Sequence, residues 1–291
     1  MRIAVVGARG QLGAAIVQAA GREHDVHAFD RAALDLTDDL GVMDAMTAVE
    51  PDAIVNCSGY NMVDAAETHA VDALKVNAFA VRTLARAAKE VGATLVHYST
   101  DFVFDGTATE PMPETLPPNP RSVYASSKLL GEWFAADAPV SYVLRVESLF
   151  GCAPGGPDKG SLTNIVNGLR AGTPVKVFGD RTVSPTHVGD CALATLALLE
   201  RHAEPGLYHC VNSGHGTWHD VGLEAARQLE LPANFTVVSV DDVKLPAARP
   251  KYCALSNAKI NAAIGYALPT WQDALRRYLG KGQGTRDRDK G

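Results

Sequence analysis

Short apolar runs alternate with helix-like stretches up to about residue 150, and this alternation constrains the fold more than any other feature. The runs RIAVVG, DVHAFD, DAIVNC, ATLVHYST and SYVLRV are separated by segments with helical spacing of apolar residues. Strands that are apolar nearly throughout are buried on both faces, which is typical of parallel sheets covered by helices. The sequence therefore predicts an α/β protein built on a doubly wound parallel sheet.

The pattern changes after about residue 150. The segment GCAPGGPDKG is rich in glycine and proline and predicts a loop, and the elements beyond it are shorter and less regular. Within PTHVGDCALATLALLERH we expect a helix that packs on the main core, with Thr186 as its N-cap. We predict a nucleotide-binding domain at 1–155 with 186–212 packed against it, a smaller interwoven C-terminal substrate lobe at 156–185 and 213–280, and a disordered tail at 281–291.

Composition and charge exclude several classes of protein. The chain has 291 residues and 46% hydrophobic content, enough to bury a large core without disulfides or structural metals. A net charge of −6 without a basic stripe argues against nucleic acid as a partner. No apolar run approaches the roughly 20 residues that span a bilayer, and no signal-type segment precedes the first strand. We therefore expect a cytoplasmic protein with no membrane partner.

The distribution of the cysteines also bears on the compartment in which the protein is expected. The five thiols are widely scattered, and none of them forms a C-x-x-C motif. This distribution argues against a disulfide framework and against a metal site, and it favours a reducing compartment.

A glycine-rich loop, GARGQLG, directly follows the first strand and opens a helix. Its glycines, Gly7, Gly10 and Gly13, would allow a tight turn, close approach to a pyrophosphate, and packing of the helix against the strand. The helix N-terminus would supply free N–H groups and a positive dipole end. The loop therefore predicts a dinucleotide site in a Rossmann-type fold, with the spacing G-x-x-G-x-x-G.

Residues beyond this loop bear on the adenosine end of the dinucleotide. Asp30 ends the second predicted strand, where a carboxylate would bind ribose hydroxyls. Arg31 beside it and Arg9 in the glycine loop would instead pair with a 2′-phosphate, so the sequence leaves NAD(H) and NADP(H) open. The segments DLTD, at 35–38, and CSGY, at 57–60, follow further strands and would flank the adenine and ribose.

The segment YASSK places Tyr124 and Lys128 four positions apart, on one face of a predicted helix. A neighbouring ammonium favours the phenolate, which would make the tyrosine a useful general acid. In isolation such a pair is more typical of a solvated helix surface. Here the strand LVHYST also presents Ser99 and Thr100 at its carboxyl end, and the glycine loop would supply a hydride donor.

Motifs spread over nearly the whole chain carry a resemblance to a known family. Besides the glycine loop, they are PDAIVNCSGYNMVDAAE, Asn77 in KVNA, HYSTDFVFDG, YASSKLLGE, Arg145 in LRVESLFG, SPTHVGDCA, ARPKYCALSNAKI and LPTWQDALRRYL. With them the chain resembles the extended branch of the short-chain dehydrogenase/reductase superfamily and, within it, the dTDP-4-dehydrorhamnose reductase family. The segments STDFVFDG and ARP are specific to this family and its near relatives.

The resemblance implies NAD(P)H-dependent reduction of the 4-keto group of a nucleotide-linked deoxysugar. Tyr124 would protonate the carbonyl oxygen, Thr100 would donate a hydrogen bond to it, and Lys128 would hold the nicotinamide ribose and lower the pKa of the tyrosine. The implied cofactor-binding residues are Gly7, Arg9, Gly10, Gln11, Leu12, Gly13, Asp30, Arg31, Asp35, Leu36, Cys57, Ser58, Gly59, Tyr60, Asn77, Ser99, Tyr124, Lys128 and Arg145.

Departures from related patterns favour simple reduction. Dehydratases follow the Thr-Asp pair with a glutamate, whereas this chain has Phe102, and fucose-type epimerase/reductases have a cysteine that is absent between residues 98 and 123. Glu147 lies in VESLF where relatives carry Thr-Ser-Trp. Its carboxylate would accept a hydrogen bond from a hydroxyl or amino group of a different hexose. The predicted substrate-binding residues are Asp101, Phe102, Val103 and Glu147 for the sugar, and Arg181 and Arg249 for the diphosphate.

Two other functions remain open at this point. A relative of the family regulates methionine adenosyltransferase, so a regulatory subunit with a retained dinucleotide pocket is one alternative. A nucleotide-sugar epimerase, which would not consume its cofactor, is the other. We also expect that the protein forms a homodimer. His187 and Trp271 are expected to be structural, the latter as part of the core.

Overall fold

The computed structural model describes residues 1–21, 23–153 and 155–281. The disordered tail predicted at 281–291 lies, apart from its first residue, outside the described residues.

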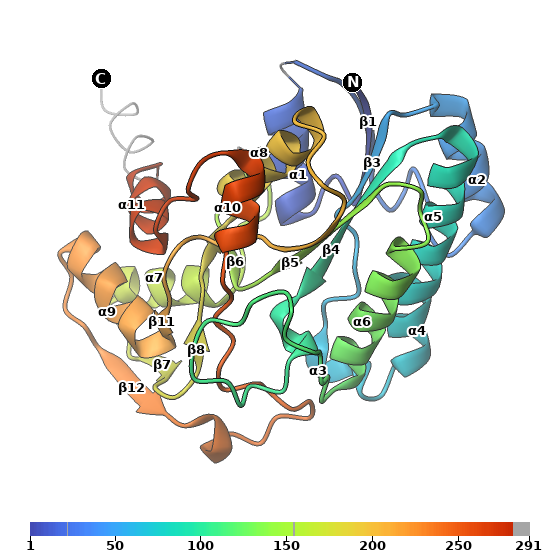
Figure 1. The fold of residues 1–291 in the computed structure, drawn as a ribbon. Coiled ribbons are helices and arrows are strands. Elements are labelled where there is room, and N and C mark those ends of the chain that lie inside the picture. The colour runs from blue at the N-terminus through green and yellow to red at the C-terminus, as the bar shows by residue number, and fades with distance from the viewer. Residues whose placement is uncertain (22, 154, 282–291) are drawn as a thin grey trace.

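A six-stranded sheet with the order β2-β1-β3-β4-β5-β10 forms the centre of the molecule (Figure 1). Every neighbouring pair in it is parallel, which confirms the predicted fold class. The chain leaves β1 for β2 on one side and then returns to place β3 on the other, so the direction of winding reverses between β1 and β3. The strands are β1 (Arg2–Val6), β2 (Asp25–Phe29), β3 (Ala53–Asn56), β4 (Thr94–Thr100), β5 (Ser141–Val146) and β10 (Gly206–His209).

Helices cover both faces of this sheet because alternate residues of each strand point to opposite sides. In β1, Ile3 and Val5 pack into the core cluster that also holds apolar residues of α1 and α8. Ala4 and Val6 pack into the other cluster, with residues of α2 and α5. The helices on the first face are α1 (Gln11–Ala20), α8 (Val188–Glu200) and α10 (Ala258–Ile264); those on the second are α2 (Asp39–Val49), α5 (Ala80–Val91) and α6 (Val123–Ala135).

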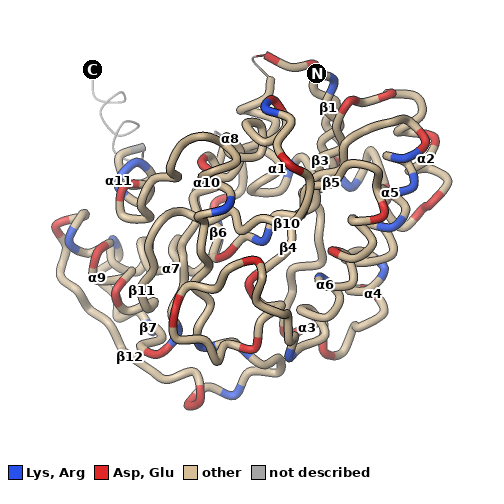
Figure 2. Tube along the Cα trace, in the orientation of Figure 1, with Lys and Arg blue, Asp and Glu red and all other residues tan. Residues whose placement is uncertain are grey.

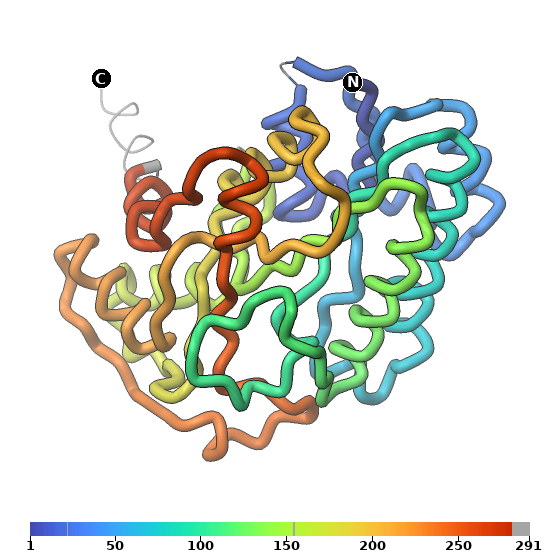
Figure 3. Tube along the Cα trace, viewed as in Figure 1, coloured from blue at the N-terminus to red at the C-terminus, as the bar shows by residue number. Residues whose placement is uncertain are grey.

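A second apolar core lies beside the sheet and includes Phe150, Leu162, Trp218 and Trp271. The chain enters and leaves this region more than once, as the colour changes in Figure 3 show. The 4% exposure of Trp271 confirms its predicted place in a core. The main elements here are α7 (Ser161–Ala171), β7 (Val175–Phe178), α9 (Trp218–Leu229), β12 (Phe235–Val238) and α11 (Trp271–Lys281).

Short elements complete the chain. They are α3 (Val63–Ala66), α4 (Ala70–Leu74), a π-helix (Lys75–Phe79), 3-10 turns at Asp101–Val103 and Val240–Asp242, and the two-residue strands β6 (Leu149–Phe150), β8 (Thr182–Val183), β9 (Thr186–His187) and β11 (Gly216–Thr217).

The predicted cap of α8 is wrong by one residue. The N-cap is His187, whose ring nitrogen Nδ1 accepts a hydrogen bond from the backbone N–H of Gly189 at 3.2 Å. Thr186 lies in β9, and its hydroxyl donates to the carbonyl of Ser184. An imidazole can replace a hydroxyl as a cap because its unprotonated nitrogen is an acceptor.

Figure 2 shows Lys and Arg dispersed among Asp and Glu along the trace. Within the described ranges, no helix combines the length and the apolar composition needed to cross a membrane.

Candidate active site

The glycine loop lies between β1 and α1, where the strand order reverses and α/β sheets bind their ligands. Gly7 has φ +76°, and a Cβ there would lie 2.9 Å from the backbone nitrogen of Ser58. A Cβ on Gly13 would overlap the carbonyl oxygen of Gly7. Gly10 is the N-cap of α1 and has no side chain to occupy the free N–H groups of the first turn. The loop therefore leaves an open cradle for an anion.

Polar residues around the cradle already have partners. Arg9 forms an ion pair with Asp30 at 2.7 Å, and its side chain is 87% exposed. Gln11 donates to the carbonyls of Gly151 and Lys159, which ties the loop to the segment after β6. Arg9 and Asp30 thus lie together at the edge of the cradle, where the adenosine end of a dinucleotide was predicted.

Three other predicted cofactor residues have side chains that are buried or already hydrogen-bonded. Leu12 and Leu36 are buried in the two cores on either side of the sheet. Asp35 caps its own turn by accepting from Thr37. The segment DLTD lies in the loop between β2 and α2, so the expectation that a further strand precedes it is wrong.

Asn77 organises the loop that follows β3. It lies in the π-helix and is 1% exposed. Its side-chain oxygen accepts from the N–H of Tyr60 at 2.8 Å, and its nitrogen donates to the carbonyl of Tyr60 and to Ser127 of α6. A Cβ on Gly131 would overlap the Asn77 carbonyl, so α6 packs directly on this turn. Single-turn π-helices often mark functional sites, and this one positions the 57–60 loop against α6.

The predicted catalytic residues converge at the carboxyl end of β4. Tyr124 and Lys128 lie in the first turns of α6 and are 8% and 4% exposed. Thr100 is the last residue of β4, and its side chain is near enough to Tyr124 to lower the pKa of the phenol. Lys128 Nζ donates to the carbonyl of Tyr98, two residues earlier on the same strand. The structure therefore brings all three side chains to one place.

The buried surroundings of the phenol set its pKa. Burial raises the pKa of Tyr124, the Asp101 carboxylate raises it further, and the neighbouring Thr100 side chain lowers it. Lys128 Nζ donates to the Tyr98 carbonyl, and the expectation that Lys128 lowers the pKa of the tyrosine stays a prediction. Tyr124 is a neutral phenol near pH 7, the form that donates a proton.

Phe102 connects the tyrosine to the two predicted diphosphate ligands. Its ring lies edge-on to Tyr124 at a centroid distance of 5.7 Å. The guanidinium groups of Arg181 and Arg249 lie 5.1 and 5.7 Å from the same ring centroid. Arg249 also pairs with Asp64 at 2.8 Å. Two cations from distant parts of the sequence thus lie beside the ring of Phe102, which itself contacts Tyr124.

The other predicted sugar ligands are in the interior. Val103 is fully buried with Phe104 and Met112. Asp101 and Glu147 are 3% and 2% exposed. Glu147 Oε2 accepts from the N–H of Ser184, the residue after β8, at 2.6 Å.

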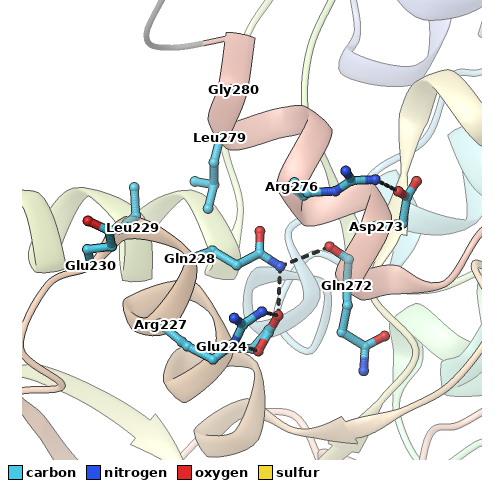
Figure 4. A pocket seen from close by; sticks show the side chains of 10 residues that line it. All are labelled: Glu224, Arg227, Gln228, Leu229, Glu230, Gln272, Asp273, Arg276, Leu279 and Gly280. Atoms are coloured by element: carbon cyan, nitrogen blue, oxygen red, sulfur yellow. Dashed lines mark hydrogen bonds and ion pairs between the residues drawn. The ribbon is translucent and has the colours of Figure 1, made fainter.

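Pockets among the described residues lie near and far from these side chains. One of about 740 Å³ opens at the start of α6 and is lined by Glu67, Ser122, Val123 and Ala248, neighbours of Tyr124 and Arg249. Another, of about 540 Å³, lies between α9 and α11 and contains none of the predicted site residues (Figure 4). In it Gln228 bridges Glu224 and the carbonyl of Gln272. The first of these pockets therefore adjoins the candidate site.

Arg145 and Ser99, predicted to bind cofactor, both contact a residue that the sequence analysis missed. Arg145 Nε and Nη2 donate to the two oxygens of Glu132 at 2.8 and 2.7 Å, and Ser99 donates to the same carboxylate at 2.5 Å. Glu132 follows Lys128 by four positions, as Lys128 follows Tyr124, so all three share one face of α6. This four-residue spacing was the sequence feature that could have identified Glu132 as a neighbour of the site.

Comparison with known proteins places the chain in a family. A family model described as the RmlD substrate binding domain matches residues 1–283. The chain belongs to the dTDP-4-dehydrorhamnose reductase family. A dTDP-4-dehydrorhamnose reductase of Streptomyces griseus is 34% identical over 279 residues, which cover 93% of this chain and 90% of the relative.

Other relatives in the family extend the comparison. A probable dTDP-4,6-dihydroxy-2-methyloxan-3-one 4-ketoreductase of Streptomyces antibioticus is 34% identical and covers 95% of this chain and 94% of its own. The crystal structure of dTDP-4-dehydrorhamnose reductase from Bacillus anthracis in complex with NADP has a TM-score of 0.90 at 29% identity. It covers 96% of this chain and 99% of its own.

Gly13→Ala tests the cradle in this reductase-family chain. The added Cβ would force the Gly7 carbonyl to move and open the turn between β1 and α1. We expect the dissociation constant for NADPH or NADH, measured by fluorescence titration, to rise by about tenfold or more, equivalent to about 1.4 kcal/mol. Gly280→Ala is the control, because a Cβ at Gly280 would meet nothing within 4 Å. Unchanged affinity in Gly13→Ala would exclude this loop as the cradle.

Proposed function

We propose that the protein reduces the 4-keto group of a nucleotide-linked deoxysugar with NADPH or NADH. The observation that carries this proposal is the convergence of Thr100, Tyr124 and Lys128 at the end of β4. The glycine cradle is formed at the same edge of the sheet, as the parallel strand order requires. Membership of a family of such reductases supports the same reaction.

The cofactor fits the residues present. The space that a Cβ would fill at Gly7 and Gly13 is left open, and the first turn of α1 has free N–H groups for a pyrophosphate. When bound, the cofactor supplies a hydride to the carbonyl carbon. Arg9 is exposed enough to meet a 2′-phosphate, whereas Asp30 would accept from unmodified ribose hydroxyls. Titration of the protein with each cofactor would therefore decide between NADP(H) and NAD(H).

The chain's own residues supply the proton and the orientation. Tyr124, a neutral phenol, donates its proton to the oxygen of the substrate carbonyl. Thr100, a neighbour of Tyr124 at the end of β4, orients that oxygen. Lys128 places a positive charge beside β4. Arg181 and Arg249 bind the diphosphate, and the ring of Phe102 holds both guanidinium groups in place.

The decisive test measures NADPH and NADH oxidation with a panel of dTDP- and GDP-linked 4-keto sugars. We expect stoichiometric oxidation with at least one dTDP-linked sugar. Interconversion of sugars without net oxidation would identify an epimerase. Co-purification with a synthetase, with no oxidation on any sugar, would identify a regulatory subunit. A cytoplasmic location and a homodimer stay predictions.

Lys128 makes cofactor binding dependent on pH. Burial lowers the pKa of Lys128 to about 8, and the Glu132 carboxylate opposes this shift. The amine is therefore charged at pH 7 and mostly neutral at pH 9.5. We expect the NADPH dissociation constant to rise roughly tenfold between these values, because the cation would stabilise the bound cofactor.

Lys128→Arg is the matched control for this pH dependence. A guanidinium stays charged over the whole range, so the rise between pH 7 and 9.5 should disappear. An equal rise in both proteins would show that another group titrates.

A further inference from the structure

Two polar side chains lie side by side inside the central sheet, next to the glycine cradle. Asn56 ends β3 and is 1% exposed, and His97 of β4 is fully buried. The strand register pairs Asn56 with His97 on one side and with Val6, the last residue of β1, on the other. Polar groups in the apolar centre of a sheet are costly unless they have hydrogen-bond partners, so this pair requires an explanation.

The amide of Asn56 holds the loop that follows β3. Its oxygen Oδ1 accepts from the backbone N–H of Ser58 at 3.1 Å and from the Ser58 hydroxyl at 2.5 Å. The N–H of Cys57 donates to the carbonyl of Val6 at 2.9 Å. The loop lies against the cradle, because a Cβ on Gly7 would lie 3.0 Å from the carbonyl carbon of Cys57. A movement of Ser58 would therefore change one wall of the cradle.

These hydrogen bonds determine which ring nitrogen of His97 carries the proton. A backbone N–H can only donate, so the Asn56 atom that faces Ser58 is the oxygen, and the atom that faces His97 is the nitrogen Nδ2. Nδ2 lies 3.1 Å from His97 Nδ1, which accepts and is therefore unprotonated. The ring is neutral, with its proton on Nε2. Burial lowers the pKa of His97 well below its usual value, and the charge of Lys128 lowers it further.

Asn56 and His97 orient each other. His97 Nε2 has no hydrogen-bond partner among the described residues, so the Asn56 amide is the group that orients the ring. A Cβ on Gly131 would lie 3.1 Å from this nitrogen, which shows that α6 packs closely against the ring. The helix therefore limits movement of the ring on that side, and Nδ1 stays directed at Asn56.

Resting on the proposed reductase function, we propose that Asn56 and His97 are positioning residues that hold the 57–60 loop in the shape that receives the dinucleotide. His97 acts through Asn56, and Asn56 acts through Ser58, so neither of them needs to contact the cofactor. The order of the three side chains follows from the printed hydrogen bonds between them.

The far end of the same loop is held independently. Asn77 accepts from the N–H of Tyr60 and donates to its carbonyl, so the loop is fixed at both ends before any cofactor binds. A preformed loop raises affinity because less conformational freedom is lost on binding. Loosening the Ser58 end should therefore weaken the binding of the cofactor more than it slows the chemical step.

Asn56→Ala tests the first of these contacts. The change leaves the N–H and the hydroxyl of Ser58 without their acceptor. We expect the NADPH dissociation constant, measured by fluorescence titration, to rise about tenfold. Turnover at saturating NADPH should fall much less, because the reacting groups are untouched. A general folding defect would instead lower turnover and affinity together.

A pair of substitutions at His97 tests the second contact. The side-chain oxygen of an asparagine can take the place of Nδ1, so His97→Asn still accepts from Asn56. His97→Leu has a similar size but no acceptor. We expect His97→Leu to raise the NADPH dissociation constant about fivefold and His97→Asn to restore most of the affinity. Equal affinities in the wild type and His97→Leu, or equal losses in both variants, would overturn the proposal.

Asn212→Ala is the matched control. Asn212 is also 1% exposed, and its oxygen also accepts from a backbone N–H, that of His187, at 2.7 Å. Its nitrogen donates to Asp190 and to the carbonyl of Pro269, away from the 57–60 loop. Its replacement should lower the melting temperature without raising the dissociation constant for NADPH. If Asn56→Ala does not fold, the pair of variants at His97 decides.

A long-range ¹H–¹⁵N spectrum tests the protonation of His97 without cofactor or substrate. At pH 7 we expect an unprotonated Nδ1 and a protonated Nε2, in signals that His97→Asn lacks. A proton on Nδ1 would overturn the proposal. Wild-type protein that binds neither NADPH nor NADH would overturn the reductase function as well. Tight binding that survives both Asn56→Ala and His97→Leu would overturn the positioning role alone.

Discussion

Replacing Tyr124 by Phe should lower turnover by at least about a hundredfold, the scale expected when a general acid is removed. Phe keeps the edge-on contact with the ring of Phe102 and removes only the hydroxyl. Cofactor affinity should therefore stay nearly unchanged. The measurement is the rate of NADPH oxidation with the active sugar, together with a fluorescence titration of the cofactor.

Tyr142→Phe is the control for the loss of a buried phenol. Its hydroxyl donates to the carbonyl of Ala203, outside the candidate site, so turnover should be retained. Full turnover in Tyr124→Phe would remove the tyrosine from the mechanism, and an equal loss in both variants would indicate a defect in folding.

Replacing Arg145 by Met should lower the free energy of unfolding by about 3–5 kcal/mol, because it leaves a buried carboxylate without its cation. Arg145 and Glu132 are 2% and 7% exposed and are joined by two hydrogen bonds. The guanidinium also lies 4.9 Å from the ring centroid of Phe104. Denaturant unfolding followed by circular dichroism measures the change.

Two further variants give this prediction its controls. The double variant Arg145→Met, Glu132→Met should recover most of the lost stability, since it removes both charges together. Arg227→Ala, which breaks the ion pair with Glu224 at the surface, should change the free energy of unfolding only slightly, because water and salt screen an exposed pair. A loss in Arg145→Met no larger than in Arg227→Ala would mean that the buried pair contributes little.

Sequence alone was sufficient to predict those features that depend on the residues of a single short segment. The apolar strands predicted a parallel sheet, because residues buried on both faces have no polar alternation. Gly7, Gly10 and Gly13 predicted a tight strand-to-helix turn, and the structure contains it. The spacing of Tyr124 and Lys128 placed them on one helical face at the first turns of α6.

Tertiary structure decided which distant residues meet and what charge they carry. Arg181 and Arg249 meet at Phe102 only because the second core folds against the end of β4. Arg145 pairs with Glu132 because β5 and α6 pack together, a contact with no local signature. Local spacing sets the direction of a side chain, whereas burial and partners from other elements set its pKa. For that reason the position of the Tyr124 phenol was predictable from the sequence, whereas the rise of its pKa through burial was not.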